Sequence, residues 1–325
     1  MAELKIEKKT NLGFIPEIIG YLANIEDHDY IYTDYKIRHP GAVFNIVTHY
    51  LVEDFIDLLK ELEVCQAAYD ENREINLERK LRILILDFLK YQDSCYEIIM
   101  GCCKQHEPPK KGAFYKDWLN SKNHKYFAAE NLNIHIKSLD EFDQIRKINN
   151  RLKHTSFVLR PSIFLSQDSI IHGFYVEGAI AVRGVGPDDE IHLKYDGNTR
   201  SANSYNFTLI NLYYILYKIS DILKKVIIQH YRDVFSFEIA FNDAHIENDK
   251  NWKELHDRIT KLPNDYFPNE FGKITYKIQN TDSQLIFNKK SAEPKELDGS
   301  FLGKFNGDGF SRTYGIPYMS PKTNR

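Results

Sequence analysis

The spacing of apolar residues predicts four long helices. From Ala42 onward, apolar positions recur every three or four residues, which places them on one face of an amphipathic helix. Between 76 and 105 the apolar residues surround the helix almost completely, so this second helix is expected at the centre. A third helix starts near Ser138, where Ser-Leu-Asp-Glu has the form of a capping box, and a fourth covers Ser204–Tyr231. Long helices joined by polar connections favour an antiparallel bundle.

A different pattern separates the third helix from the fourth. Over about 157–197, Val, Ile, Phe and Tyr alternate among glycines, which predicts two to four short antiparallel strands. The helical periodicity weakens after the fourth helix, where we expect a small α+β region at 233–290 and a flexible, glycine-containing tail at 291–325. The predicted fold class is therefore mainly α: a lead-in at 1–41, then a four-helix bundle over 42–232 with a β insertion.

Composition excludes several classes of protein. The 325 residues are 42% hydrophobic and 27% charged, so the chain is not wholly disordered. It carries 43 Lys and Arg against 46 Asp and Glu, a net charge of −3. A protein that coats nucleic acid usually has a strongly basic domain, so a polyanion would have to meet a local patch of this chain.

The sequence favours a cytoplasmic location. Its first residues mix acids with lysines and lack the apolar core of a signal peptide. No stretch supplies the roughly 20 uncharged residues of a membrane span, so we expect no membrane contact. All four cysteines lie in helical sequence, which favours reduced thiols over disulfides. These cysteines are Cys65, Cys95, Cys102 and Cys103.

Positive charge gathers on one face of the third helix. Lys147, Arg151 and His154 are spaced four and three residues apart, so they lie above one another with Asn150 beside them. Like charges at this spacing cost about 0.2–0.5 kcal/mol per pair, which is easier to understand if an anion binds among them. The alternative is a solvated helix face on which Asp143 partly neutralises Lys147.

The segment Asn149–His154, Asn-Asn-Arg-Leu-Lys-His, resembles the motif of the HEPN superfamily, and helix order extends the resemblance over about 42–231. The resemblance implies a four- to five-helix bundle that forms a homodimer. Many members are metal-independent endoribonucleases, often toxins or abortive-infection proteins of prokaryotic defence, and others have lost catalysis. No cofactor and no metal are implied.

The family motif is an Arg followed by four to six residues and a His, often with Asn directly after the Arg. By resemblance, Asn150 takes the place of the motif Asn and His154 that of the His, while Lys153 matches a basic residue often found before it. The position of the family Arg holds Asn149. This departure bears on catalysis more than on fold. The neighbouring cations are Arg146, Lys147 and Arg151.

The resemblance implies a specific chemistry. Metal-free RNA cleavage needs an acid/base, for which His154 is suited because imidazole titrates near pH 6.5. Arg151, Arg146 or Lys147 would stabilise the phosphorane charge, and Asn150 would orient the imidazole or the phosphate. We therefore expect a toxin of a defence system that cleaves RNA. We expect it to form a homodimer and to have RNA and an accessory or antitoxin protein as partners. The alternatives are a catalytically inactive module that binds a protein or RNA in a defence complex, and an unrelated helical scaffold.

Other patterns are weaker. Cys102 and His106 lie one helical turn apart near Cys95 and Cys103, but structural zinc sites prefer paired Cys-x2–4-Cys knuckles, so buried thiols are expected. The sequence Gly-Val-Gly-Pro-Asp at 184–188 lacks the Gly-Lys-Ser/Thr ending of a phosphate loop. The acids that follow it indicate a charged hairpin turn.

Overall fold

The structure is a computed structural model, and about 50% of its residues are helical and 21% lie in strands. Two β-sheets accompany the helices, so the predicted mainly α four-helix bundle is wrong. The structure describes all residues except 1, 10–12, 68–75, 103–126, 155, 168, 182–183, 196, 198, 243, 245, 247–248, 304–309, 312, 320–321 and 324–325.

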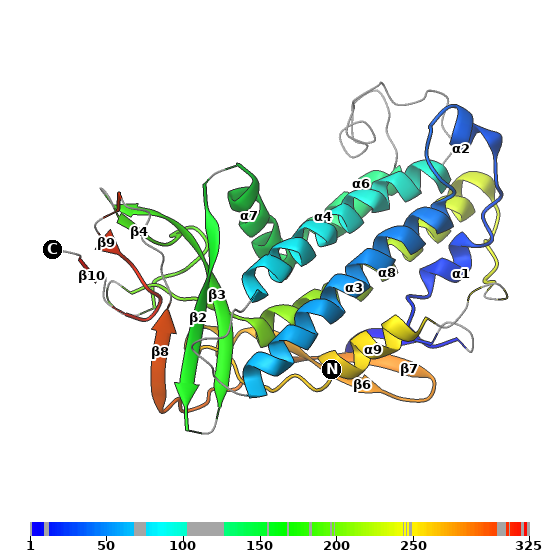
Figure 1. Cartoon of the computed structure of the whole chain (residues 1–325). Coiled ribbons are helices and arrows are strands. Elements are labelled where there is room, and N and C mark those ends of the chain that lie inside the picture. Colours follow the sequence, from blue (N-terminus) through cyan, green and yellow to red (C-terminus); the bar gives the residue numbers. More distant parts are fainter. Residues whose placement is uncertain are drawn as a thin grey trace.

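Long helices form the body of the molecule (Figure 1). The two longest N-terminal helices, α3 and α4, lie side by side, and α8 packs against both the helices and the sheets. The helices are α1 (Ile18–Leu22), α2 (Asp29–Thr33), α3 (Pro40–Ala67), α4 (Leu77–Cys102), α6 (Phe127–Lys137), α7 (Asp140–His154), α8 (Tyr205–Phe235) and α9 (Lys250–Ile259), with a 3-10 turn, η1, at Pro268–Glu270.

A small antiparallel sheet covers α8 along one side. Its strands are β1 (Ala2–Glu7), β6 (Ile274–Asn280) and β7 (Gln284–Ser291), in the order β1-β7-β6. Tyr276 of β6 stacks on Tyr214 of α8, with ring centroids 3.7 Å apart. The sheet therefore buries a face of α8 that a four-helix bundle would cover with another helix.

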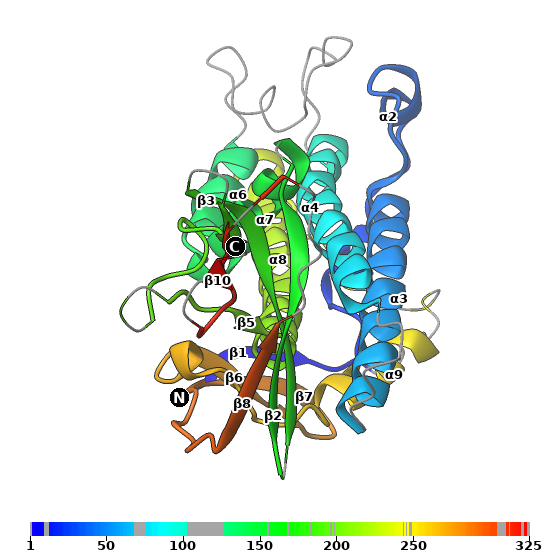
Figure 2. The same ribbon diagram turned by 60° about the vertical axis from the view of Figure 1, so that its left-hand side comes forward.

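A larger, curled sheet lies at one end of the long helices (Figures 1 and 2). Its order is β10-β9-β4-β3-β2-β8, and β5 pairs with β3. The region at 291–325 contributes three of these strands. The strands are β2 (Val158–Ser166), β3 (Ile170–Ala181), β4 (Gly184–Pro187), β5 (Asn203–Ser204), β8 (Gly299–Gly303), β9 (Thr313–Tyr314) and β10 (Lys322–Thr323).

The fold-class prediction fails because strand pairing here is non-local. β1 pairs with β7 near the other end of the chain, and β2 pairs with β8. Local periodicity identifies helices, but it does not show which distant strand will complete a sheet. The sheets also change what covers the helices, because α8 meets β3 and β6 as well as α4, α6 and α7.

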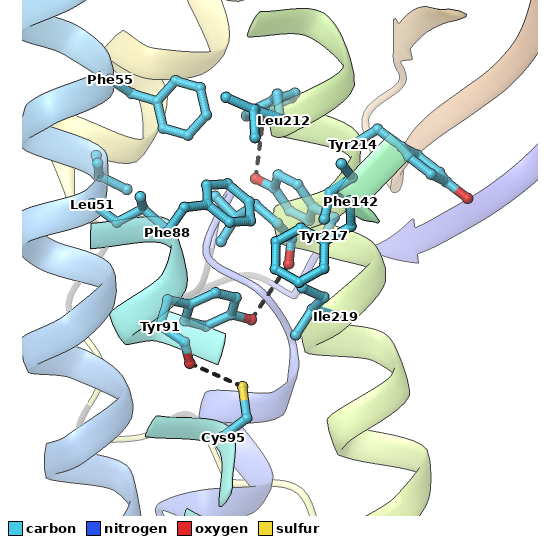
Figure 3. Close-up of a cluster of buried hydrophobic side chains, with 14 of the residues drawn as sticks. Leu51, Phe55, Phe88, Tyr91, Cys95, Phe142, Leu212, Tyr214, Tyr217 and Ile219 are labelled. Carbon is cyan, nitrogen blue, oxygen red and sulfur yellow. Dashed lines mark hydrogen bonds between the residues drawn. The ribbon is translucent and has the colours of Figure 1, made fainter. Parts of the chain in front are cut away.

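An aromatic cluster joins α3, α4, α7 and α8 in the core (Figure 3). The ring of Phe88 lies 6.3 Å from that of Phe55 and 5.9 Å from that of Phe142. The buried hydroxyl of Tyr91 lies 2.7 Å from Ser220 Oγ, and the Cys95 thiol donates to the Tyr91 carbonyl oxygen. Each polar atom named here thus has a partner inside an apolar core, as burial requires.

Candidate functional site

Helix α7, which carries the predicted motif, lies between the other helices and the larger sheet (Figure 1). Its apolar face is buried, and Lys147, Asn150 and Lys153 are exposed on the opposite face. The helix begins at Asp140, two residues after Ser138, whose hydroxyl donates to the His135 carbonyl oxygen. The buried residues of the apolar face are Phe142, Ile145, Ile148 and Leu152.

Two of the predicted cations share one acid. Asp143 lies 3.3 Å from a guanidinium nitrogen of Arg146 and 2.9 Å from Lys147 Nζ. These are helix pairs three and four residues apart, and they match the solvated-face alternative more closely than an open anion site. A phosphate at this position would have to compete with the Asp143 carboxylate.

Arg151 holds a distant loop against α7. Its guanidinium lies 3.6 Å from the carboxylate of Asp188 and forms an ion pair with Glu190. It also lies over the ring of Phe157, 5.2 Å from the centroid. Asp188 is buried and accepts hydrogen bonds from the backbone N–H groups of Glu190 and Ile191. The predicted hairpin acids are therefore the partners of a predicted catalytic cation.

The remaining motif residues do not meet in one place. Asn149, at the position of the family Arg, is only 4% exposed, and its Oδ1 has no hydrogen-bond partner among the described residues. Asn150 is exposed. The side chain of His154 lies outside what the structure describes. The predicted catalytic group of His154, Arg151, Asn150, Lys147 and Arg146 stays a prediction.

The part of the chain that the structure describes contains no group of three His, Cys, Asp or Glu residues able to hold a metal ion. Cys65, Cys95 and Cys102 are buried and form no disulfide among the described residues, and Cys103 and His106 fall within the 103–126 gap in the description. Within the described residues, no helix combines the length and the apolar character needed to cross a membrane.

A pocket of about 430 Å³ lies on the inner side of α7, away from the predicted cationic face. It is bounded by α7, the first turns of α8, β3, β5 and the segment 272–274, which leads into β6. Its walls are mainly apolar, and its volume is in the range of small-molecule sites. The apolar wall residues are Ile145, Ile148, Phe174, Phe207, Leu212, Ile215 and Ile274.

Three side-chain amides are set into this apolar wall. Gln144 donates through Nε2 to Asn203 Oδ1 at 3.2 Å, which fixes the Asn203 amide. Asn203 Nδ2 and Asn211 Oδ1 are buried and have no hydrogen-bond partner among the described residues. Asn203 is 7% exposed and Asn211 is 5% exposed. An unmatched buried polar group costs about 1–3 kcal/mol, so leaving this donor and this acceptor without partners lowers the stability of the fold.

Opposite charges lie at the rim of the pocket. Lys273 and Asp140 both line it and both are exposed. Lys273 is close enough to the buried Glu270 carboxylate to act on it electrostatically and lower its pKa. The pocket thus combines apolar walls, three side-chain amides, and one cation and one anion at its opening.

Glu270 fixes the segment 272–274 against the start of α8. Its carboxylate accepts the backbone N–H of Ser204 at 2.8 Å, the Ser204 hydroxyl at 2.6 Å and the backbone N–H of Phe267 at 2.8 Å. Burial raises the pKa of Glu270 to about 7, against the opposing effect of these hydrogen bonds. Gly272 has a φ of +77°, which favours glycine at the bend that turns the chain toward Lys273.

The sequence gives little indication of this pocket. Asn211 is a polar residue within the apolar run of α8, and Asn203 directly precedes the helix cap Ser204. A buried amide in a helix usually forms hydrogen bonds with neighbouring residues. Asn211 therefore stands out only once the structure shows that one of its amide atoms has no partner.

Comparison with known proteins identifies no relative. No protein-family model matches the chain, and neither the curated proteins nor the solved structures yield a match. Only the geometry of α7 and of the pocket beneath it therefore bears on function.

Proposed function

We propose that this protein binds a small polar molecule in the α7–α8 pocket and acts through that binding, without cutting RNA. The observation that carries the proposal is a mainly apolar pocket of about 430 Å³ whose wall includes the side-chain amides of Asn203 and Asn211. A small polar ligand would combine apolar contacts with the walls and hydrogen bonds to these amides.

The charges on the outer face of α7 support the same proposal. Asp143 pairs with Arg146 and Lys147, and Arg151 pairs with Asp188 and Glu190. Cations that stabilise a phosphorane must be available to it in the transition state. Cations already matched by carboxylates serve the fold more readily than catalysis, which favours a non-catalytic binding protein over the predicted ribonuclease.

A ligand screen on the full chain tests the proposal. Thermal unfolding in the presence of a collection of small polar metabolites should reveal at least one that raises the midpoint, because a molecule that binds only the native state stabilises it. Asn211→Leu should abolish this shift, since it removes a side-chain amide from the pocket wall. Asn150→Leu, on the exposed face of α7, is the matched control and should keep the shift.

The proposal is wrong if no metabolite raises the midpoint, or if the shift is the same in the Asn211→Leu protein as in wild type. A shift lost in Asn150→Leu but kept in Asn211→Leu would move the binding site to the outer face of α7.

A further inference from the structure

We infer that a second pocket, between the C-terminal end of α9 and β6, binds a small phosphomonoester. This α9–β6 pocket has a volume of about 520 Å³ and shares no lining residue with the α7–α8 pocket, so the inference is independent of the proposed function. It follows from the lysines that line the pocket, from one side-chain amide and from the apolar residues beside them.

Two lysines bring positive charge to this pocket. Lys277 of β6 is exposed and Lys290 of β7 is partly exposed, so both can reach a ligand. Lys277 lies opposite Asn288, which is two residues from Lys290 on β7, and both lysines therefore lie on one face of the hairpin. Neither forms an ion pair with an acid that the structure describes. Like charges at neighbouring positions repel each other, and a bound anion would offset that repulsion.

A third lysine and one acid complete the charges of the lining. Lys295 forms an ion pair with Asp265 at 2.7 Å, and Glu293 is exposed. Helix α9 ends beside the pocket, and the carbonyl oxygens at a helix C-terminus carry partial negative charge that would repel an anion. In this helix the carbonyl oxygens of 256–259 already accept hydrogen bonds from the turn 260–262. Positive charge therefore predominates among the described residues of the lining.

An amide of fixed orientation lies beside Lys290. Asn264 Oδ1 accepts a hydrogen bond from Lys290 Nζ at 2.7 Å and another from the Tyr266 hydroxyl at 3.1 Å. An ammonium group can only donate, so the amide oxygen must face it, and Asn264 Nδ2 is left as a donor. Asn264 is exposed, and its Nδ2 donates to no residue that the structure describes. The pocket therefore offers a ligand two ammonium groups and one amide N–H group.

A phosphomonoester matches these donors. Its phosphate carries a charge of about −1.5 to −2 at pH 7 and three acceptor oxygens, whereas a carboxylate or a sulfate ester carries a single charge. The pocket is much larger than a phosphate ion, and its volume is in the range of about 300–1,000 Å³ typical of small-molecule sites. Ile278 and Pro294, both accessible in the lining, offer apolar surface to the rest of the ligand.

Calorimetric titration of the full chain with phenyl phosphate tests the inference. Phenyl sulfate has the same shape with a single charge, and inorganic phosphate has the charge without the apolar body. Phenyl phosphate should bind at least about threefold more tightly than either of these two controls, because only phenyl phosphate can pair with both lysines and contact the apolar residues.

Charge variants locate the binding site. Lys277→Gln and Lys290→Gln should each weaken phenyl phosphate about three- to tenfold, the effect of losing one hydrogen bond to a charged group. Glu293→Gln should strengthen it, because the substitution removes a negative charge from the lining. Lys289→Gln, at an exposed position next to Lys290 but outside the lining, is the matched control and should leave the affinity unchanged. Urea unfolding of each variant without ligand verifies that the fold is intact.

The inference fails if phenyl phosphate does not bind, or if phenyl sulfate binds as tightly. An equal loss in Lys289→Gln and Lys277→Gln would also overturn it, because binding would then follow the overall charge of the chain. Asn211→Leu should bind phenyl phosphate as wild type does. A metabolite that stabilises the chain in an Asn211-dependent way, without any binding of phenyl phosphate, would therefore reject this inference alone, and the reverse result would reject only the proposed function.

Discussion

Ser204 bonds to both oxygens of the Glu270 carboxylate, through its backbone N–H at 2.8 Å and its hydroxyl at 2.6 Å. The same hydroxyl oxygen accepts the N–H of Phe207 and so caps α8. One buried carboxylate thus joins the start of the longest helix to the turn that precedes β6. Because Lys273 follows three residues after Glu270, this contact also sets one side of the pocket opening.

Glu270 should make the protein less stable as pH rises from about 4.5 to 7. Burial raises its pKa to about 7 from an ordinary value of 4.5, so in this window the folded state holds a proton that the unfolded state has lost. Stability is then full below the unfolded pKa and falls as pH approaches the folded one, by on the order of 3 kcal/mol. Urea unfolding of wild type and Glu270→Gln at pH 5 and pH 8 measures this.

The glutamine variant should gain on wild type as pH increases, because it cannot ionise. Glu296→Gln, at an exposed position, is the control and should follow the wild-type profile. Parallel profiles for Glu270→Gln and wild type would mean that Glu270 does not titrate in this range.

Asn211→Leu should leave the unfolding free energy unchanged or raise it by about 1 kcal/mol, although it abolishes ligand binding. In the ligand-free fold the amide oxygen is buried without a partner, so its replacement by an apolar group of similar size removes a desolvation cost. Most buried substitutions destabilise. Denaturant unfolding without ligand measures the effect, and a loss above about 2 kcal/mol would indicate that Asn211 has a structural role instead.

The helices were accessible from the sequence because their signal is local. The predicted start of the first long helix at Ala42 lies two residues from its observed start at Pro40, and the predicted fourth helix, Ser204–Tyr231, lies within one residue of α8 at its N-terminal end. The sheets were not accessible to the same degree. β1 is a six-residue strand whose partner, β7, begins at Gln284, and no local pattern specifies that pairing.

The candidate site, too, could be predicted from the sequence only in part. Helical geometry correctly placed Lys147 and Asn150 on an exposed face, but it gave no indication that Arg151 would meet Asp188 from a loop after β4. The pocket depends on Asn203 and Asn211 lying on either side of a strand-to-helix junction. Each has a buried amide atom without a hydrogen-bond partner, and a sequence does not show which buried polar atoms lack one in the folded chain.

Arg151→Ala should destabilise the protein by about 1–3 kcal/mol. The substitution leaves the buried carboxylate of Asp188 with its two backbone N–H donors but without its counter-charge. Lys147→Ala removes an exposed pair with Asp143 and should cost less than about 1 kcal/mol. In a double-mutant cycle, Asp188→Asn should recover part of the loss in the Arg151→Ala background. Equal effects of Arg151→Ala and Lys147→Ala would show that Arg151 is only a surface charge.

The purified protein should not cleave RNA in a manner that depends on His154. The cations that the motif would supply are matched by Asp143, Asp188 and Glu190, and the position of the family Arg is a buried Asn149. A dual-labelled single-stranded RNA, incubated with wild type and with His154→Ala prepared in parallel, measures cleavage directly, and any activity common to both preparations is contamination. Cleavage by wild type that His154→Ala abolishes would restore the ribonuclease prediction, because an imidazole that acts as acid or base cannot be replaced by a methyl group.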